Sequence, residues 1–227
     1  MPTQTALIIG ASRGLGLGLT KEYLTRGWHV TATVRGTART RLHDLANPRL
    51  RIETLDINDP AQTKALHKSL ENQTFDLLFV NAGVSNGPTE TIATVPTETF
   101  AHIMLTNALS PMRLIERLES LVPRTGAIAV MSSGLGSVAD NNSGGWEVYR
   151  ASKAALNTLM RSFAARHTND PRTLLLIAPG WVRTDMGGPN AHLDVETSMK
   201  GVADTITSRT GQPGLHYVNY QGQTVPW

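Results

Sequence analysis

Short apolar runs recur along the chain, and segments with a helical spacing of apolar residues lie between them. A run of about four to eight apolar or β-branched residues is typical of a strand buried on both faces. We expect strands at residues 6–9, 29–34, 50–55, 75–80, 127–131 and 174–177 and near 217–218. We expect helices at residues 15–26, 39–45, 61–70, 98–121, 148–167 and 195–208.

This alternation of strand and helix predicts an α/β fold. We expect a single doubly wound, Rossmann-type domain over residues 1–227, with a parallel sheet of about seven strands and helices on both faces. Asp59 followed by Pro60 is typical of a helix start, and Gly27 of a helix end. Within the domain, residues 186–210 are expected to form a substrate loop and a lid helix.

The composition fits a folded protein without disulfides. Of the 227 residues, 40% are hydrophobic and 17% are charged, which allows a sizeable core. The formal net charge is +3 and the basic residues are scattered, so we expect no nucleic-acid partner. The sequence has no cysteine, and its seven histidines form no metal-binding motif, so we expect no metal.

We also expect no contact with a membrane. No apolar run approaches the roughly 20 residues needed to cross a bilayer, and the run near the N-terminus is too short for a signal peptide. Together with the missing cysteines, this favours a cytoplasmic protein.

Three glycine-rich stretches follow predicted strands, at residues 10–18, 132–145 and 179–190. Ligands of open α/β sheets bind where the strands end. The first stretch contains three glycines in a G-x-x-x-G-x-G pattern, which would let backbone amides approach a pyrophosphate. A glycine turn needed only for packing is the alternative. The candidate phosphate-binding residues are Gly10, Ser12, Arg13, Gly14, Leu15 and Gly16.

The end of the second predicted strand bears on the choice of dinucleotide. NAD sites usually have an acidic residue there, but this strand ends in Val34, Arg35 and Gly36. Guanidinium groups at Arg35 and Arg13 suit a 2′-phosphate. The sequence therefore favours NADP(H) over NAD(H), whereas Arg39 is more simply interpreted as a surface charge.

Tyr149 and Lys153 are four positions apart on a predicted helix and share one of its faces. Beside a cationic nicotinamide ring, the ammonium is expected to lower the pKa of the phenol by roughly two to three units, which would make it an acid–base catalyst. Ser132 and Ser133 end the fifth predicted strand, where a hydroxyl could hydrogen-bond a carbonyl oxygen. Asn107 precedes Pro111 by four residues, and because proline has no N–H, we expect a kink there and a carbonyl of Asn107 that is free to bind water. A helix bent only for packing is the alternative.

These residues together resemble the short-chain dehydrogenase/reductase family over essentially the whole chain. The motifs that carry the resemblance are Gly10-x3-Gly14-x-Gly16, Asn81-Ala82-Gly83, Asn107, Ser133, Tyr149-x3-Lys153 and Pro179-Gly180-x3-Thr184. The segments from Ser132 to Arg150 and from Pro179 to Gly188, and the terminal Val225-Pro226-Trp227, are similar to the C-factor-like and Sniffer-like carbonyl reductases. Two departures are Ile9, where many members have threonine, and the long interval between Ser133 and Tyr149.

The resemblance implies a role for each residue. Tyr149 would be the general acid/base, Lys153 its pKa modifier and a ribose ligand, Ser133 the group that polarises the carbonyl, and Asn107 the holder of a relay water. Further cofactor contacts are implied for the adenine at Asp56 and Ile57, for the adenosine ribose at Asn81, Ala82 and Gly83, and for the nicotinamide side at Pro179, Gly180, Val182 and Thr184.

The expected function is NADP(H)-dependent interconversion of a carbonyl and an alcohol on a small molecule. Trp146, Trp181 and Met186 suggest an apolar wall and a hydrophobic substrate, although they could equally be packing residues. The alternative is a C-factor-type signalling or sensing protein with incidental turnover. A sugar-nucleotide epimerase or dehydratase fits the glycine spacing less well. The resemblance also suggests a homodimer or homotetramer.

Overall fold

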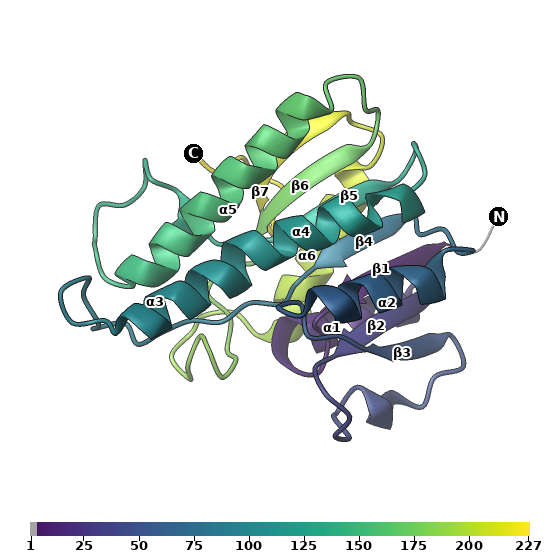
Figure 1. Cartoon of the computed structure of the whole chain (residues 1–227), viewed down its shortest axis with the longest axis horizontal. Coiled ribbons are helices and arrows are strands. Elements are labelled where there is room, and N and C mark those ends of the chain that lie inside the picture. The colour runs from purple at the N-terminus through teal and green to yellow at the C-terminus, as the bar shows by residue number, and fades with distance from the viewer. Residues whose placement is uncertain (1–3) are drawn as a thin grey trace.

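Seven parallel strands form one sheet in the order β3-β2-β1-β4-β5-β6-β7 (Figure 1). The structure is a computed structural model that describes residues 4–227, so residues 1–3 of the expected domain lie outside it. The doubly wound α/β fold predicted from the sequence is confirmed. The strands are β1 (Thr5–Ile9), β2 (His29–Val34), β3 (Leu50–Thr54), β4 (Leu77–Val80), β5 (Ala127–Met131), β6 (Thr173–Ala178) and β7 (Gly214–Asn219).

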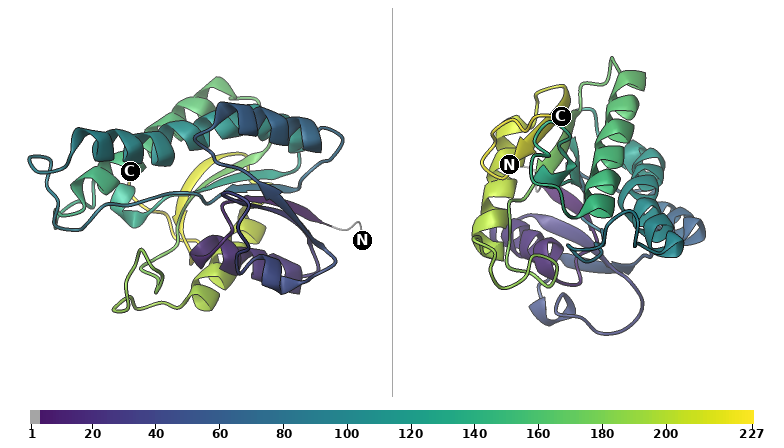
Figure 2. Two further views of the ribbon diagram at one scale, coloured as in Figure 1. Left: turned by 60° about the horizontal axis from the view of Figure 1, so that its bottom comes forward. Right: turned by 90° about the vertical axis from the view of Figure 1, so that its left-hand side faces the viewer.

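Helices cover both faces of this sheet (Figure 2). One layer contains α1 (Gly14–Thr25) and α6 (Val195–Arg209). The other contains α2 (Pro60–Leu70), α3 (Thr97–Met104), α4 (Ser110–Leu118) and α5 (Glu147–Arg166). The expected caps are present, since the Asp59 carboxylate accepts the amides of Ala61 and Gln62 at the start of α2.

The strands are apolar throughout because their alternate side chains enter two different cores. In β1, Leu7 and Ile9 pack in the core beneath α2, α4 and α5, whereas Ala6 and Ile8 pack in the core beneath α1 and α6. Every residue of β4, β5 and β6 is buried. A polar side chain on these central strands would therefore be buried on whichever face it occupied.

The helix predicted at residues 39–45 is wrong. Only a 3₁₀ turn forms there, η1 (His43–Leu45), and no residue of that turn is buried. The main-chain amide of Thr40 donates to Nδ1 of His43, which fixes a turn just before it. A segment this short gains too little packing to offset the cost of nucleating an α-helix.

The helix predicted at residues 98–121 is interrupted at its centre. A π-helical turn, η2 (Leu105–Leu109), joins α3 to α4, and a 3₁₀ turn, η3 (Glu119–Leu121), ends the segment. The amide of Ser110 donates to the carbonyl of Leu105, five residues back. Pro111 cannot donate to the carbonyl of Asn107, so the interruption lies where the sequence predicts a departure from regular helix.

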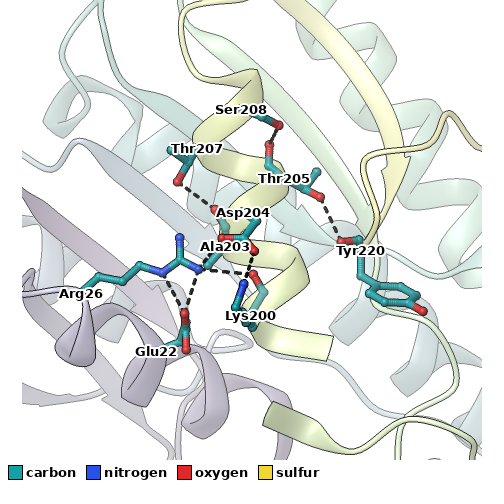
Figure 3. A network of polar contacts seen from close by, with 9 residues as sticks. All are labelled: Glu22, Arg26, Lys200, Ala203, Asp204, Thr205, Thr207, Ser208 and Tyr220. Carbon is teal, nitrogen blue, oxygen red and sulfur yellow. Dashed lines mark hydrogen bonds and ion pairs between the residues drawn. The ribbon is translucent and has the colours of Figure 1, made fainter. Parts of the chain in front are cut away.

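An ion-pair network joins α6 to α1 (Figure 3). Arg26 contacts Glu22 at 2.8 Å and Asp204 at 2.7 Å, and Lys200 contacts Asp204 at 2.7 Å. On the sheet side of α6, Met199 is fully buried. Helix α6 is thus a packed element of its layer. Of the residues 186–210, expected to form a substrate loop and a lid helix, Met186 and Gly187 line a cavity at the ends of the central strands, and no residue of α6 does.

Candidate active site

A cavity of about 910 Å³ opens where the central strands end. The glycine turn after β1, the segments after β4 and β5, the start of α5 and the loop after β6 all line it. Its wall includes most residues predicted for the site: Gly10, Ser12, Arg13, Gly14, Leu15, Arg35, Asp56, Ile57, Asn81, Ala82, Gly83, Ser133, Tyr149, Lys153, Pro179, Gly180, Val182 and Thr184. Gly16 and Asn107 do not line the cavity and are buried behind it.

The start of α1 offers an anion-binding site. No side chain caps this helix, and its first turn contains no acidic residue. Its amides and the positive end of its dipole are thus left for a ligand. Gly10 has a φ of +87°, and a Cβ there would lie 2.8 Å from the Cβ of Ala82. The turn is therefore shaped by close packing and fits the phosphates of a dinucleotide.

Thr33 braces this turn from the neighbouring strand. Its Oγ1 accepts a hydrogen bond from the amide of Gly10 at 2.9 Å, and Thr33 is 1% exposed. Ile9 lacks the hydroxyl that many family members have at this place, and the Thr33 hydroxyl on β2 supplies a brace. No sequence pattern predicts this contact, because it depends on which strands are neighbours in the sheet.

The arginines near the turn have different partners. Arg35 is exposed, lines the cavity and has no ion pair among the described residues. Arg13 also lines the cavity, but its Nη1 contacts the Asp185 carboxylate at 2.7 Å. Arg39 pairs with Asp44 at 2.7 Å and is not part of the cavity wall. Arg35 is therefore the arginine most available to a 2′-phosphate.

Tyr149 and Lys153 lie on the cavity side of α5, as their spacing predicts. Nζ of Lys153 is 5.8 Å from the centroid of the Tyr149 ring and donates to the carbonyl of Met131 at 2.9 Å. Lys153 is 3% exposed. Its ammonium is thus fixed between the end of β5 and the phenol.

Burial dominates the titration of both groups. It raises the pKa of Tyr149 to about 12, while hydrogen bonding to the Ser133 side chain acts in the opposite direction. Burial also lowers the pKa of Lys153 to about 8. In the protein without a dinucleotide the pKa of the phenol is therefore raised, and the lowering expected beside a nicotinamide cation stays a prediction. The loss of hydration is the largest cause for each group, and it disfavours the charged form.

Lys153→Met is expected to stabilise the protein. A shift of the Lys153 pKa from 10.5 to about 8 corresponds to a penalty of roughly 3 kcal/mol for the buried ammonium. The lost hydrogen bond offsets about 1 kcal/mol of the gain. The net gain should be full below pH 8 and should shrink as the pH rises to 10.5, because the unfolded lysine alone stays charged in that interval.

Urea unfolding of wild type and Lys153→Met at pH 7 and pH 10 measures this gain. Subtracting the free energies of unfolding of the two proteins at each pH removes the contribution of the titrating groups that both contain. A gain that is absent at pH 7, or that increases with pH, contradicts the interpretation.

The two serines after β5 have different surroundings. Oγ of Ser132 donates to Asn157 at 2.6 Å, and Ser132 is 1% exposed. Oγ of Ser133 accepts the amide of Leu135 at 3.1 Å at the start of the 3₁₀ turn η4 (Gly134–Gly136). Because its Oγ accepts this amide, the Ser133 hydroxyl can donate its own hydrogen to an oxygen in the cavity, the phenol of Tyr149 included.

Asn107 acts on the cavity through the segment after β4. Its Nδ2 donates to the carbonyl of Val84 at 2.7 Å and to Oγ of Ser152 at 3.0 Å, and its Oδ1 accepts the amide of Val84 at 2.8 Å. The side chain thus holds Val84 by two hydrogen bonds and Ser152 by a third. The main-chain carbonyl of Asn107 cannot accept a hydrogen bond from residue 111, because proline has no N–H.

The C-terminal part of the chain contributes residues that the sequence did not indicate. Oη of Tyr217 donates to the carbonyl of Ser133 at 2.5 Å, and Tyr217 is 2% exposed. Asn219, Tyr220 and Val225 line the cavity. The only sequence signal in this region was the terminal Val-Pro-Trp that the chain shares with the resembling group.

Within residues 4–227, no group of three or more histidine, aspartate or glutamate side chains could hold a metal ion. In the same range, no helix is both long and apolar enough to cross a membrane.

The topology and the turn at α1 place the protein in the class of dinucleotide-binding α/β proteins. The family model for short chain dehydrogenases matches residues 4–193. The chain therefore belongs to the short-chain dehydrogenase/reductase family, and it is an oxidoreductase of that family.

Three similar proteins illustrate this membership. A putative short-chain dehydrogenase/reductase from Burkholderia multivorans with bound NADP is 55% identical and superposes with a TM-score of 0.98 over 100% of both chains. A carbonyl reductase from Pseudomonas aeruginosa PAO1 in complex with NADP is 38% identical, with a TM-score of 0.91 over 99% of this chain and 100% of that one. The C-signal of Myxococcus xanthus is 38% identical over 157 residues, which are 67% of this chain and 92% of the relative.

The resemblance inferred from the motifs is thus confirmed. The matches include both C-signal and the carbonyl reductase Sniffer of D. melanogaster, which represent the two groups named from the sequence.

Proposed function

We propose that the protein is an NADP(H)-dependent oxidoreductase that interconverts a carbonyl and an alcohol on a small, hydrophobic substrate. One observation carries the proposal. The phenol of Tyr149, the ammonium of Lys153 and the hydroxyl of Ser133 meet in the same cavity as the glycine turn that fits a dinucleotide. A proton donor, a cation and a hydrogen-bond donor for a carbonyl oxygen are the groups that such a reaction requires.

The bound dinucleotide would supply or accept the hydride. Oη of Tyr149 holds the proton that moves to or from the substrate oxygen. The Ser133 hydroxyl, oriented by the amide of Leu135 at its Oγ, donates to the same oxygen. Lys153 favours the phenolate when the proton has left. The carbonyl of Asn107 would hold the water that passes the proton to and from the solvent.

The cofactor residues are proposed in the same places as the sequence suggests. Asp56 and Ile57 would contact the adenine, Asn81 to Gly83 the adenosine ribose, and Lys153 the ribose next to the nicotinamide. Residues 179–184 would cover the nicotinamide. Trp146, Trp181 and Met186 line the same cavity and support an apolar substrate.

The similar proteins support this assignment. Both solved structures described above hold NADP, and one of them is a carbonyl reductase. The signalling alternative rests on the name of C-signal. All the proposed catalytic groups are present in this chain, so we favour the enzyme.

A panel of ligands and substrates separates the two functions. NADPH and NADP should raise the melting temperature more than NADH and NAD do, and NADPH should then be oxidised when diketones or aldehydes are added. Stabilisation by NADPH without turnover of any carbonyl compound would favour the signalling function. No stabilisation by any dinucleotide would contradict both.

Arg35→Ser is expected to weaken NADPH binding by about 10- to 100-fold, because one or two charge-assisted hydrogen bonds to the 2′-phosphate are lost. NADH binding should stay the same. Arg39→Ser is the matched control, since Arg39 pairs with Asp44 away from the cavity. Isothermal titration with both dinucleotides measures the effect, and an equal loss for NADH would refute the role of Arg35.

A further inference from the structure

The loop before α5 has an unusual backbone. Gly144, Gly145 and Trp146 have φ values of +62°, +67° and +53°, so three successive residues are left-handed. Glycine adopts this conformation readily, whereas tryptophan is strained by it. Within residues 4–227, the only other non-glycine residue with a positive φ is Ala46. A strained residue next to a site is a reason to ask what it does there.

Arg150 holds this loop in place. Its Nε donates to the carbonyl of Gly145 at 2.9 Å, and its Nη2 donates to the carbonyl of Gly144 at 3.1 Å and to Oγ of Ser143 at 3.0 Å. Arg150 is 8% exposed, and no carboxylate pairs with it among the described residues. The buried guanidinium of Arg150 therefore holds residues 143–145 in place through its three hydrogen bonds.

Two further contacts anchor the loop to the segment after β4. The amide of Trp146 donates to the carbonyl of Pro88 at 3.3 Å. The Glu147 carboxylate accepts the amide of Ile92 at 2.6 Å. The loop is thus held from both sides, which explains how the left-handed tryptophan persists.

The result is an indole beside the catalytic phenol. The rings of Trp146 and Tyr149 are 6.2 Å apart between centroids and are inclined at 66°, edge to face. Both residues line the cavity. A substrate whose carbonyl oxygen binds at Oη of Tyr149 thus shares the cavity with the indole.

We propose that Trp146 is a specificity-determining residue that favours carbonyl compounds with an aromatic group next to the carbonyl, and that Arg150 is its positioning residue. The inference rests on the proposed function. It adds a substrate class, because an aromatic substituent can pack against the indole in an edge-to-face or offset arrangement, and a methyl group offers much less contact.

Diacetyl and its phenyl analogue acetylbenzoyl provide a matched pair of diketones. The quantity measured is the ratio of kcat/KM for acetylbenzoyl to that for diacetyl. Trp146→Gly, which suits the left-handed backbone and removes the ring, is expected to lower this ratio about tenfold, mainly through KM for acetylbenzoyl. Trp146→Asn is the second variant, because asparagine also tolerates this conformation. Trp146→Phe should keep most of the ratio.

Ala46→Gly is the matched control, because it relieves the backbone strain at the other left-handed residue. Ala46 is not part of the cavity wall, so this variant should leave the ratio unchanged. Arg150→Lys loses the planar guanidinium that reaches three acceptors in the loop. It should therefore lower the ratio of kcat/KM values, as Trp146→Gly does, and it should change this ratio more than it changes kcat. An unchanged ratio in Trp146→Gly and Trp146→Asn, or an equal loss for both diketones, overturns the proposal alone. Absence of turnover in wild type with any carbonyl compound overturns the proposed function and, with it, this inference.

Discussion

Tyr149→Phe is expected to lower kcat for carbonyl reduction by about a thousandfold, because the group that holds the transferred proton is removed. The phenyl ring fills the same space, and the contacts proposed for the dinucleotide lie mainly elsewhere in the cavity. NADPH affinity should therefore change little. Steady-state kinetics with a diketone and titration with NADPH measure the two effects on the same protein.

Tyr23→Phe is the matched control for this substitution. Tyr23 lies on α1 and is fully buried. Among the described residues, its hydroxyl has no hydrogen-bond partner. Its removal should leave activity unchanged and stability equal or higher. Carbonyl reduction that survives in Tyr149→Phe at more than about a tenth of the wild-type rate would refute the role of Tyr149.

Gly16→Ala is expected to have the second large effect, a loss of NADPH affinity of about a hundredfold or more together with a drop in stability of about 2 kcal/mol. A Cβ at this position would lie 2.1 Å from the carbonyl oxygen of Gly10 and 2.7 Å from Nδ2 of Asn81. These two atoms are themselves hydrogen-bonded at 2.7 Å. The added methyl group would have to displace the glycine turn from Asn81, although Gly16 itself does not line the cavity.

Gly87→Ala is the control for this glycine. A Cβ at Gly87 would lie 4.0 Å from its nearest neighbour, the side chain of Glu90, so the added methyl group has room. Thermal unfolding and NADPH titration of both variants distinguish a local clash from a general cost of removing glycine. Normal NADPH binding by Gly16→Ala would contradict the packing argument.

The sequence predicts the order of the elements because the central strands are buried on both faces. Such strands form continuous apolar runs, and the helices between them have one apolar face, so both patterns are visible locally. The error at residues 39–45 has a physical cause as well. Two leucines at helical spacing suggested a helix, but only Leu42 is buried and the chain turns at His43.

The predicted site residues share a different property, since each belongs to a short motif at the end of a strand or on one helix face. The spacing of Tyr149 and Lys153 indicates a common face without any tertiary information. Thr33 and Tyr217 were missed because their hydrogen bonds cross to other strands. The raised pKa of Tyr149 in the protein alone could not be predicted, because the degree of burial cannot be read from spacing.

The left-handed backbone at Trp146 has a consequence for protein engineering. A library selected only for heat tolerance would enrich glycine or asparagine at this position, since both relieve the local strain. Such a selection would replace Trp146 without measuring any effect of this change on substrate specificity. Under the role proposed for Trp146, directed evolution therefore needs a screen that tests discrimination between competing carbonyl compounds as well as heat tolerance.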